Sequence, residues 1–416
     1  MDRGYLRRAL DDWSAATALL GPELRGRLQP PPLPQRHAVA LIGVRRCGKT
    51  HLALEMAARS GLRTLYFNFE DPLLTTEADV SIFDDLVAVH TEATGREPEL
   101  VVWDELQNVP GWERWVRKAV DTRRHRLIVT GSSAKLLSAE LASAIAGRAL
   151  RHEVWPLSFA EALAFRGVDP DVLTPHERVA ALRDYLQWGG MPEVVLTDQP
   201  VRRTQLLRHY VDDIVLRDVL SRHAIRDKRR LDQLIAYATT NSACLFTFRR
   251  LKNAFGIDVE VAQQYLSHLT DAFFAFAVPR YHPSLTVQVR DPQKLYVIDT
   301  GIRNAMSRSH SEDVGRLAEG AVYIDLRRRG CDVTYWQDGS HEVDFVVRDG
   351  STPTAAIQVT WDGLAEGPTR DRELDGVFAA LDALSLSEGL VLTRDRDERV
   401  RRAGRTALLM PVWRFL

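Results

Sequence analysis

The sequence contains little lysine and little cysteine. Lys and Arg together make 55 of its 416 residues, yet only six of the 55 are lysines. A lysine at a chemically meaningful spacing is therefore unusually informative. The three cysteines, Cys47, Cys244 and Cys331, lie far apart and form no C-x-x-C pair. Their number and spacing argue against a disulfide framework and a cysteine-based zinc site, and indicate reduced thiols.

Long apolar runs are absent as well. No stretch approaches the roughly 20 apolar residues that span a bilayer, and the first residues lack the apolar core of a signal peptide. We therefore expect a cytoplasmic protein without a membrane segment. A net charge of −1 gives no overall basic field that would attract nucleic acid. The hydrophobic fraction of 45% and the charged fraction of 27% are those of a folded globular chain.

Strand and helix patterns alternate through the first 165 residues. Apolar runs at 38–42, 64–69, 100–103 and 126–130 predict strands, and apolar residues spaced three and four apart predict helices between them. This alternation is typical of a parallel sheet covered by helices. We therefore expect residues 1–165 to form an α/β domain.

Three further segments follow this domain. Residues 166–225 show helical periodicity and would form a lid, with a break at Gly189-Gly190-Met191-Pro192. Residues 226–292 predict three short helices and an extended pair, 273–278 and 285–290, in an order that resembles a winged helix. Residues 293–416 alternate again between strand and helix patterns and predict a second α/β domain. At roughly 150 residues per domain, the length accommodates this organisation.

A phosphate-binding loop follows the first predicted strand. Residues 43–50 read Gly-Val-Arg-Arg-Cys-Gly-Lys-Thr and match the pattern G-x-x-x-x-G-K-[ST] between a strand and a helix. Glycines let the loop curl so that its N–H groups and the helix N-terminus face phosphate oxygens. Lys49 would reach the β- and γ-phosphates, and the Thr50 hydroxyl would bind Mg²⁺. The expected nucleotide-binding residues are Gly43, Val44, Arg45, Arg46, Cys47, Gly48, Lys49, Thr50 and His51.

Two acids end the strand predicted at 100–103. The sequence Leu-Val-Val-Trp-Asp-Glu places Asp104 and Glu105 directly after an apolar run, which is the form of a Walker B segment. We expect Asp104 to hold Mg²⁺ together with Thr50. Glu105 would act as the catalytic base that polarises a water for in-line attack on the γ-phosphate. The presence of Glu105 therefore favours hydrolysis over binding alone.

Two further positions are candidates for the catalytic machinery. The strand at 126–130 runs into Gly131-Ser132-Ser133 beside the Walker B strand, where a hydroxyl would contact the γ-phosphate or the attacking water. Ser132 is the first choice for this role and Thr130 the second. Arg148 would neutralise transition-state charge, either within one subunit or from a neighbouring one.

With these residues, the chain resembles the prokaryotic AAA-type P-loop ATPases whose C-terminal half is the domain of unknown function 4143. The resemblance spans nearly the whole chain. It implies ATP as the nucleotide, a winged-helix segment, and a C-terminal α/β domain with a restriction-endonuclease-like fold of the PD-(D/E)xK type. Besides the motifs above, it rests on Val109-Pro110-Gly111-Trp112, Gly147-Arg148, Pro156-Leu157-Ser158-Phe159, Gly189-Gly190-Met191-Pro192, Tyr296-Val297-Ile298-Asp299-Thr300-Gly301 and Glu342-Val343-Asp344-Phe345.

The C-terminal domain keeps only part of the nuclease site that this resemblance implies. In such nucleases, a helix-borne Glu, an Asp and an (E/Q)-x-K strand bind a divalent metal, and the matching residues here are Glu319, Asp344 and Gln358. Gln358 retains a carbonyl that can ligate a hard cation. Thr360 stands where the pattern has lysine, and it cannot supply the cation that stabilises the attacked phosphate. We expect a nuclease-like fold with impaired or absent cleavage.

Basic residues concentrate in one segment. Residues 201–256 contain twelve Arg/Lys and five Asp, so this segment carries about +7 and the rest of the chain about −8. The segment would bind DNA phosphates, or form a solvated helix face packed against acidic surface. The helix expected at 259–270 does not favour base-specific reading, because it has no arginine. Its polar residues are Glu260, Gln263, Gln264, Ser267 and His268.

The sequence leaves three functions open. The favoured one is ATP binding and Mg²⁺-dependent hydrolysis that controls the winged-helix and nuclease-like parts and acts on DNA. The alternatives are an ATP-gated, Mg²⁺-dependent DNA nuclease and a nucleotide-switched scaffold that controls a protein partner. A homo-oligomer is favoured, although a hexameric ring, a dimer and a monomer all fit the sequence.

Overall fold

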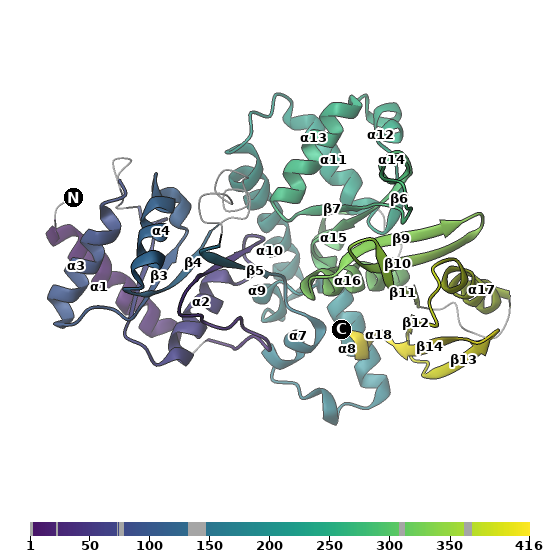
Figure 1. The fold of residues 1–416 in the computed structure, drawn as a ribbon, viewed down its shortest axis with the longest axis horizontal. Coiled ribbons are helices and arrows are strands. Elements are labelled where there is room, and N and C mark those ends of the chain that lie inside the picture. Colours follow the sequence, from purple (N-terminus) through teal and green to yellow (C-terminus); the bar gives the residue numbers. More distant parts are fainter. Residues whose placement is uncertain are drawn as a thin grey trace. The chain divides into compact units, whose positions relative to one another are not determined.

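The chain forms two compact units, Met1–Val154 and Trp155–Leu416. Figure 1 shows the computed structural model, which describes residues 3–21, 24–72, 74, 79–131, 147–307, 313–361 and 368–416. The first domain predicted from the sequence extends to residue 165, whereas helix α7 (Phe159–Phe165) belongs to the second unit. The Ser158 hydroxyl and the Glu161 carboxylate start α7 with a capping box just after the junction.

The first unit is built on a five-stranded parallel sheet with the strand order β2-β3-β4-β1-β5. All residues of β1 and β3 are buried, as parallel strands covered on both faces require. Helices α2 and α4 lie on opposite sides of this sheet (Figure 1). The predicted alternation of strands and helices is confirmed. The elements are α1 (Arg3–Leu20), β1 (Ala38–Gly43), α2 (Lys49–Ser60), β2 (Thr64–Asn68), α3 (Ile82–Thr94), β3 (Leu100–Asp104), α4 (Trp112–Thr122), β4 (Arg126–Thr130) and β5 (Ala149–Val154).

An aromatic cluster fixes the end of β3. The Trp103 ring lies 5.5 Å from the rings of both Phe69 and Phe83 and 5.7 Å from that of Trp115, centroid to centroid. Ring pairs at such distances add packing energy beyond the area they bury. The residue after Trp103 is Asp104, so this packing holds the first acid of the Walker B segment in place.

The second unit begins with a helical part. It contains α7, α8 (Pro175–Trp188), α9 (Pro192–Val195) and α10 (Pro200–Asp213), which continues into a π-helix, Ile214–Leu220. The turn between α8 and α9 fits only glycine, because a Cβ on Gly190 would lie 2.1 Å from the Leu157 carbonyl oxygen. The Gly190 N–H donates to Asp299 Oδ2 at 2.7 Å. The motifs at 189–192 and 296–301 therefore meet in this turn.

A three-stranded antiparallel sheet follows, with the order β6-β8-β7. Its segment comprises α11 (Lys228–Thr240), β6 (Cys244–Phe246), α12 (Phe248–Phe255), α13 (Val259–Asp271), β7 (Ala275–Val278), α14 (Leu285–Arg290) and β8 (Gln293–Val297). The expectation of an extended chain at 285–290 is wrong, because these residues form α14. The alternating Leu-Thr-Val-Gln-Val-Arg pattern is that of a strand, but β8 already occupies the pairing positions beside both β6 and β7.

The C-terminal part contains a six-stranded mixed sheet with the order β13-β14-β12-β11-β10-β9. Strands β9, β10 and β11 are antiparallel, whereas β12 runs parallel to both β11 and β14. Helix α17 packs its buried Val377 and Leu381 against Val346 and Val391 of the sheet. The elements are α15 (Thr300–Met306), α16 (Val314–Arg328), β9 (Asp332–Asp338), β10 (His341–Asp349), β11 (Thr352–Thr360), α17 (Pro368–Ala383), β12 (Glu388–Thr393), β13 (Glu398–Arg402), β14 (Arg405–Pro411) and α18 (Val412–Phe415).

Among the described residues, no helix has both the length and the hydrophobicity of a transmembrane segment.

Candidate nucleotide-binding site

The predicted phosphate-binding loop lies between the end of β1 and the start of α2. Gly43 has φ 151° and Gly48 has φ 95°, both in the region that favours glycine. A Cβ on Gly43 would lie only 2.1 Å from the Val154 carbonyl oxygen on the neighbouring strand β5. The first glycine is therefore needed for close strand packing, and the second for the turn into α2.

Lys49 is the second feature of the loop. Its side chain is buried, and Nζ donates to the carbonyl oxygens of Gly43 at 3.2 Å and of Val44 at 3.1 Å. The ammonium group therefore lies inside the curve of the loop, where the N-terminus of α2 also points its free N–H groups. A loop with this charge and these donors is suited to a phosphate group.

Asp104, at the end of β3, is the most connected acid of this region. Thr50 Oγ1 donates to Asp104 Oδ2 at 2.8 Å, and so do Tyr66 Oη at 2.8 Å and Asn68 Nδ2 at 3.2 Å. Thr130 Oγ1 donates to the other carboxylate oxygen. Burial raises the pKa of Asp104, and the hydrogen bonds from Thr130, Thr50 and Tyr66 oppose this rise. The sequence analysis placed Asp104 and Thr50 at one site, and the two side chains are in contact here; it did not identify Tyr66 and Asn68.

The donor chemistry of Thr50 and Asp104 fits Mg²⁺. The two side chains offer a hydroxyl and a carboxylate, which are the hard oxygen ligands that this ion prefers. Their 2.8 Å contact brings both oxygens to one point beside the phosphate-binding loop. Both residues predicted to hold the metal are therefore brought together.

Glu105 follows Asp104 at the same edge of the sheet. Its backbone has φ 54°, and its N–H donates to Thr130 Oγ1 at 3.1 Å. Gln107, in the short 3-10 helix Leu106–Asn108, donates through Nε2 to the Glu105 carboxylate. The Glu105 side chain is half-buried, so it is held in position while remaining accessible.

The remaining loop residues differ in exposure. Val44 and Cys47 are buried, whereas Arg46 and His51 are exposed. Arg45 forms an ion pair with Glu70 at 3.2 Å. The Cys47 thiol donates to the Val154 carbonyl at 3.2 Å, and burial raises its pKa. Cys47 is therefore a packing residue whose thiol is shielded from reagents.

Two catalytic candidates remain, Ser132 and Arg148. Ser132 lies outside the described residues. Arg148 is the residue before β5, and its carbonyl accepts the N–H of Ala38, the first residue of the parallel strand β1. The phosphate-binding loop follows the last residue of β1, at the opposite end of that strand. Its guanidinium pairs with Asp121 at 2.8 Å. In this structure one strand length therefore separates Arg148 from the loop, and its guanidinium does not contact the nucleotide-binding residues.

The second predicted set of residues meets in the second unit. Glu319 on α16, Asp344 on β10 and Gln358 on β11 lie together, and Lys294 on β8 contacts both acids. Burial lowers the pKa of an ammonium, but the charges of Asp344, Glu319 and Glu342 outweigh it and hold the pKa of Lys294 well above its usual value. Burial raises the pKa of Glu319 to about 7. The sequence missed Lys294, although the scarcity of lysine that singles out Lys49 applies to it equally.

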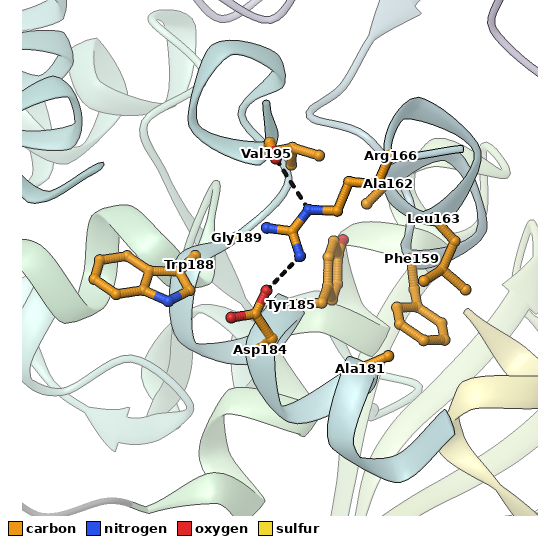
Figure 2. A pocket seen from close by; sticks show the side chains of 10 residues that line it. All are labelled: Phe159, Ala162, Leu163, Arg166, Ala181, Asp184, Tyr185, Trp188, Gly189 and Val195. Carbon is orange, nitrogen blue, oxygen red and sulfur yellow. Dashed lines mark hydrogen bonds and ion pairs between the residues drawn. The ribbon is translucent and has the colours of Figure 1, made fainter. Parts of the chain in front are cut away.

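A small cavity lies between α7, α8 and the turn before α9 (Figure 2). Its volume is about 30 Å³, so it has room for a water molecule or two and not for a nucleotide. Arg166 crosses it, donating to Asp184 Oδ2 at 2.6 Å and to the Val195 carbonyl at 3.0 Å. The cavity is lined by Phe159, Ala162, Leu163, Arg166, Ala181, Asp184, Tyr185, Trp188, Gly189 and Val195.

Two family models match parts of the chain. Residues 35–163 match AAA_14, an AAA domain, and residues 179–313 match DUF8612, a domain of unknown function. The first match confirms the AAA-type P-loop ATPase part of the resemblance. The second names a different family from the domain of unknown function 4143, and it ends before the six-stranded sheet begins at β9.

Relatives match most of the chain. The uncharacterized protein MJ1544 of Methanocaldococcus jannaschii is 30% identical over 321 residues, which cover 74% of this chain and 71% of the relative. An uncharacterized protein of Haemophilus influenzae is 29% identical over 318 residues, covering 74% of this chain and 78% of the relative. Among solved structures, the Walker-type ATPase paby2304 of Pyrococcus abyssi is 14% identical, with a TM-score of 0.43 over 65% of this chain and 90% of that one.

Proposed function

Since the chain belongs to the family of the uncharacterized protein MJ1544 and its residues 35–163 match an AAA domain, we propose that it binds ATP with Mg²⁺ and hydrolyses it. The observation that carries this proposal is the meeting of Thr50 and Asp104, 2.8 Å apart, beside the loop that holds Lys49. A coincidental glycine-rich turn would not bring a hydroxyl, a carboxylate and an ammonium to one edge of the sheet.

Each of these residues has a part in the proposed reaction. The N–H groups of the loop and of the first turn of α2 would bind the phosphates. Lys49 would exchange its bonds to the Gly43 and Val44 carbonyls for the β- and γ-phosphate oxygens. Thr50 and Asp104 would hold Mg²⁺, which neutralises charge on those oxygens when it is bound.

Glu105 would orient the attacking water. Its carboxylate would accept a hydrogen bond from the water and direct it in line with the bond that breaks. Gln107 restrains this carboxylate by its own hydrogen bond. Ser132 remains the proposed contact to the γ-phosphate, and Arg148 remains a candidate only as a residue supplied to a neighbouring subunit.

The first test removes the lysine of the loop. Lys49→Ala is expected to abolish ATP binding, measured by equilibrium binding of a fluorescent ATP analogue, because it removes the cation that contacts two phosphates. The matched control is Lys118→Ala, which removes an exposed lysine paired with Asp84 in the same unit and should bind like wild type. Unchanged binding in Lys49→Ala would overturn the proposal.

A second test separates binding from hydrolysis. Glu105→Gln should retain ATP binding but lose phosphate release by roughly a hundredfold or more, because an amide cannot act as the base. Equal rates of phosphate release in wild type and Glu105→Gln would refute the catalytic assignment of Glu105.

We further propose that nucleotide state controls a DNA-binding function of the second unit. The order α11-β6-α12-α13-β7-β8 with a three-stranded sheet supports a winged helix. Arg226, Lys228 and Arg229 are exposed at the start of this segment, and so are Arg249 and Arg250 on α12. These cations would contact phosphates. The antiparallel β9-β10-β11 ladder continued by parallel β12, with α16 and α17, supports a nuclease-like fold for the C-terminal part.

A further inference from the structure

Lys294 is buried among three carboxylates. Its side chain, on β8, is only 4% exposed. Nζ lies 2.6 Å from Glu342 Oε1, 2.7 Å from Asp344 Oδ1 and 3.1 Å from Glu319 Oε1. Nζ donates hydrogen bonds to Glu319 Oε1 and Asp344 Oδ1, and Glu342 forms an ion pair with the same ammonium group.

Further hydrogen bonds hold Glu319, Asp344 and Gln358 in this cluster. Tyr296 Oη donates to Glu319 Oε1 at 2.6 Å, and the Val359 N–H donates to Asp344 Oδ2 at 2.9 Å. The carbonyl oxygen of Gln358 accepts the Asp344 N–H at 3.1 Å, while its amide nitrogen donates to Glu373. Glu319 Oε1, both carboxylate oxygens of Asp344 and the Gln358 carbonyl are thus already bonded to groups of the protein itself.

These residues do not fit a divalent metal. Mg²⁺ requires near-octahedral oxygen ligands at 2.0–2.1 Å, several of them water. The point between Glu319 and Asp344 where the ion would lie is taken by Lys294 Nζ. Over the described ranges, the structure contains no group of three or more His, Cys, Asp or Glu residues arranged to hold a metal.

Aromatic rings pack around the buried part of the cluster. The Tyr296 ring stacks on Tyr323 with centroids 4.3 Å apart, and Phe345 lies 5.7 Å from Tyr296. The Tyr335 ring lies 5.9 Å from Lys294 Nζ, within reach of a cation–π interaction. Removing Lys294 would leave the buried charges of Glu319 and Asp344 without compensation.

We propose that Lys294 is a resident cation that permanently replaces the divalent metal of the nuclease-like site. The C-terminal part then binds no metal between Glu319 and Asp344 and cleaves no DNA. Instead, the ion cluster joins β8, the central strand of the three-stranded sheet, to α16 and β10. Thr360 stands where the nuclease pattern has lysine, and the cation of this site comes from β8 instead.

The first experiment uses the wild-type protein. Full-length chain freed of metal with EDTA is incubated with supercoiled plasmid and Mg²⁺ or Mn²⁺. We expect no nicking above the level without metal. Metal-dependent nicking that disappears in Glu342→Gln or Asp344→Asn would overturn the proposal. Glu342 is partly exposed, at 34%, so its variant is expected to fold.

The second experiment opens the site. Lys294→Met should lower the thermal unfolding midpoint of the second unit by about 10 °C, because the buried carboxylates of Glu319 and Asp344 lose their counter-charge. Mn²⁺ without nucleotide should restore several degrees in Lys294→Met but not in wild type or in Lys294→Met/Asp344→Asn. Lys252→Met is the matched control: this exposed lysine pairs with Asp258 in the same segment, and its loss should shift the midpoint by less than about 2 °C.

Each outcome of these experiments supports or refutes the proposed role of Lys294. An unchanged midpoint in Lys294→Met would refute the role of Lys294. Stabilisation of wild type by Mn²⁺ that is lost in Asp344→Asn would do the same. Should Lys294→Met not fold, the plasmid assay on wild type decides alone. None of these readouts depends on ATP, so the proposed ATPase function stands or falls separately.

Discussion

Thr130 bonds to both acids that follow β3. Its hydroxyl donates to the Asp104 carboxylate and accepts the Glu105 N–H. The side chain is completely buried on β4, which pairs with β3. Thr130 thus acts on the proposed reaction through Asp104 and Glu105, and we regard it as a positioning residue.

Thr130→Val keeps the size of the side chain and removes both hydrogen bonds. We expect kcat for ATP hydrolysis to fall roughly tenfold to a hundredfold with little change in KM, because the loop around Lys49 is untouched. Steady-state phosphate release measures this split. Thr130→Ser should recover most of the rate, since it restores the hydroxyl.

The matched control for Thr130→Val is Thr64→Val. Thr64 begins the neighbouring strand β2, and its hydroxyl donates to the Leu62 carbonyl at the opposite edge of the sheet. Its kinetics should equal those of wild type. A KM that rises as much as kcat falls in Thr130→Val would contradict the positioning role.

At the residue scale, the sequence predicted the side chains that belong to recognised motifs. It did not predict the side chains that reach the site from other strands. The pairing of Thr50 with Asp104 follows from the spacing of two known motifs, each at the end of a strand. Tyr66 and Asn68 could not be predicted, because they reach Asp104 only through the pairing of β2 with β3. Lys294 was missed for the same reason, since β8 is distant in sequence from α16 and β10.

At the scale of elements, the buried carboxylate of Asp299 holds the turn between α8 and α9 in place by hydrogen bonds. Asp299 precedes α15 and accepts the N–H groups of Gly190 and Ile302 at 2.7 and 3.0 Å. Burial nevertheless raises its pKa to about 6. Gly301 allows the close approach of α15 to the end of α8, because a Cβ at this position would lie 2.0 Å from the Trp188 carbonyl oxygen.

The raised pKa of Asp299 predicts a pH dependence. Because the folded state binds a proton that the unfolded chain releases, the contribution of Asp299 to stability is fully present below about pH 4. It is lost as the pH rises through about 6, a change of about 3 kcal/mol. Relative to Asp299→Asn, which stays neutral, the wild-type free energy of unfolding should therefore decline between pH 4 and 7.

Urea unfolding of wild type and Asp299→Asn at a series of pH values measures this difference. Asp349→Asn, at the exposed end of β10, is the control, and its profile should parallel that of wild type. A constant difference between wild type and Asp299→Asn across the range would show that the carboxylate titrates alike in both states.

Elements were predicted well where a pattern was long and had one interpretation. The buried strands of the first unit and helices such as α16 belong to this class. The six residues of α14 do not, because a short run with β-branched residues fits a strand or a helix, and pairing by β8 decided between them. The π-helix at Ile214–Leu220 also leaves no periodic signal that distinguishes it from the end of α10.

At the scale of the whole molecule, the net charge of −1 hides a segment of about +7 at residues 201–256. Some of these cations form ion pairs within the segment itself. Arg222 pairs with Asp218 at 2.7 Å, and Arg230 pairs with Asp227 at 3.2 Å. Arg226, Lys228 and Arg229 remain exposed around the start of α11, where DNA phosphates could approach them.

The salt dependence of DNA binding tests this segment. For a site that contacts phosphates, the logarithm of the affinity falls linearly with the logarithm of the salt concentration, by about 0.9 per contact. The triple variant Arg226→Gln/Lys228→Gln/Arg229→Gln should therefore reduce the slope by about 2 to 3 and weaken duplex binding roughly tenfold to a hundredfold at moderate salt. It should also remove any stimulation of ATP hydrolysis by DNA, while the rate without DNA stays at the wild-type level. Arg396→Gln/Arg399→Gln/Arg401→Gln, three exposed arginines in and beside β13, is the control of equal charge change. If both triple variants lost the same affinity and slope, binding would depend on net charge alone, and the segment at 201–256 would not be a DNA site.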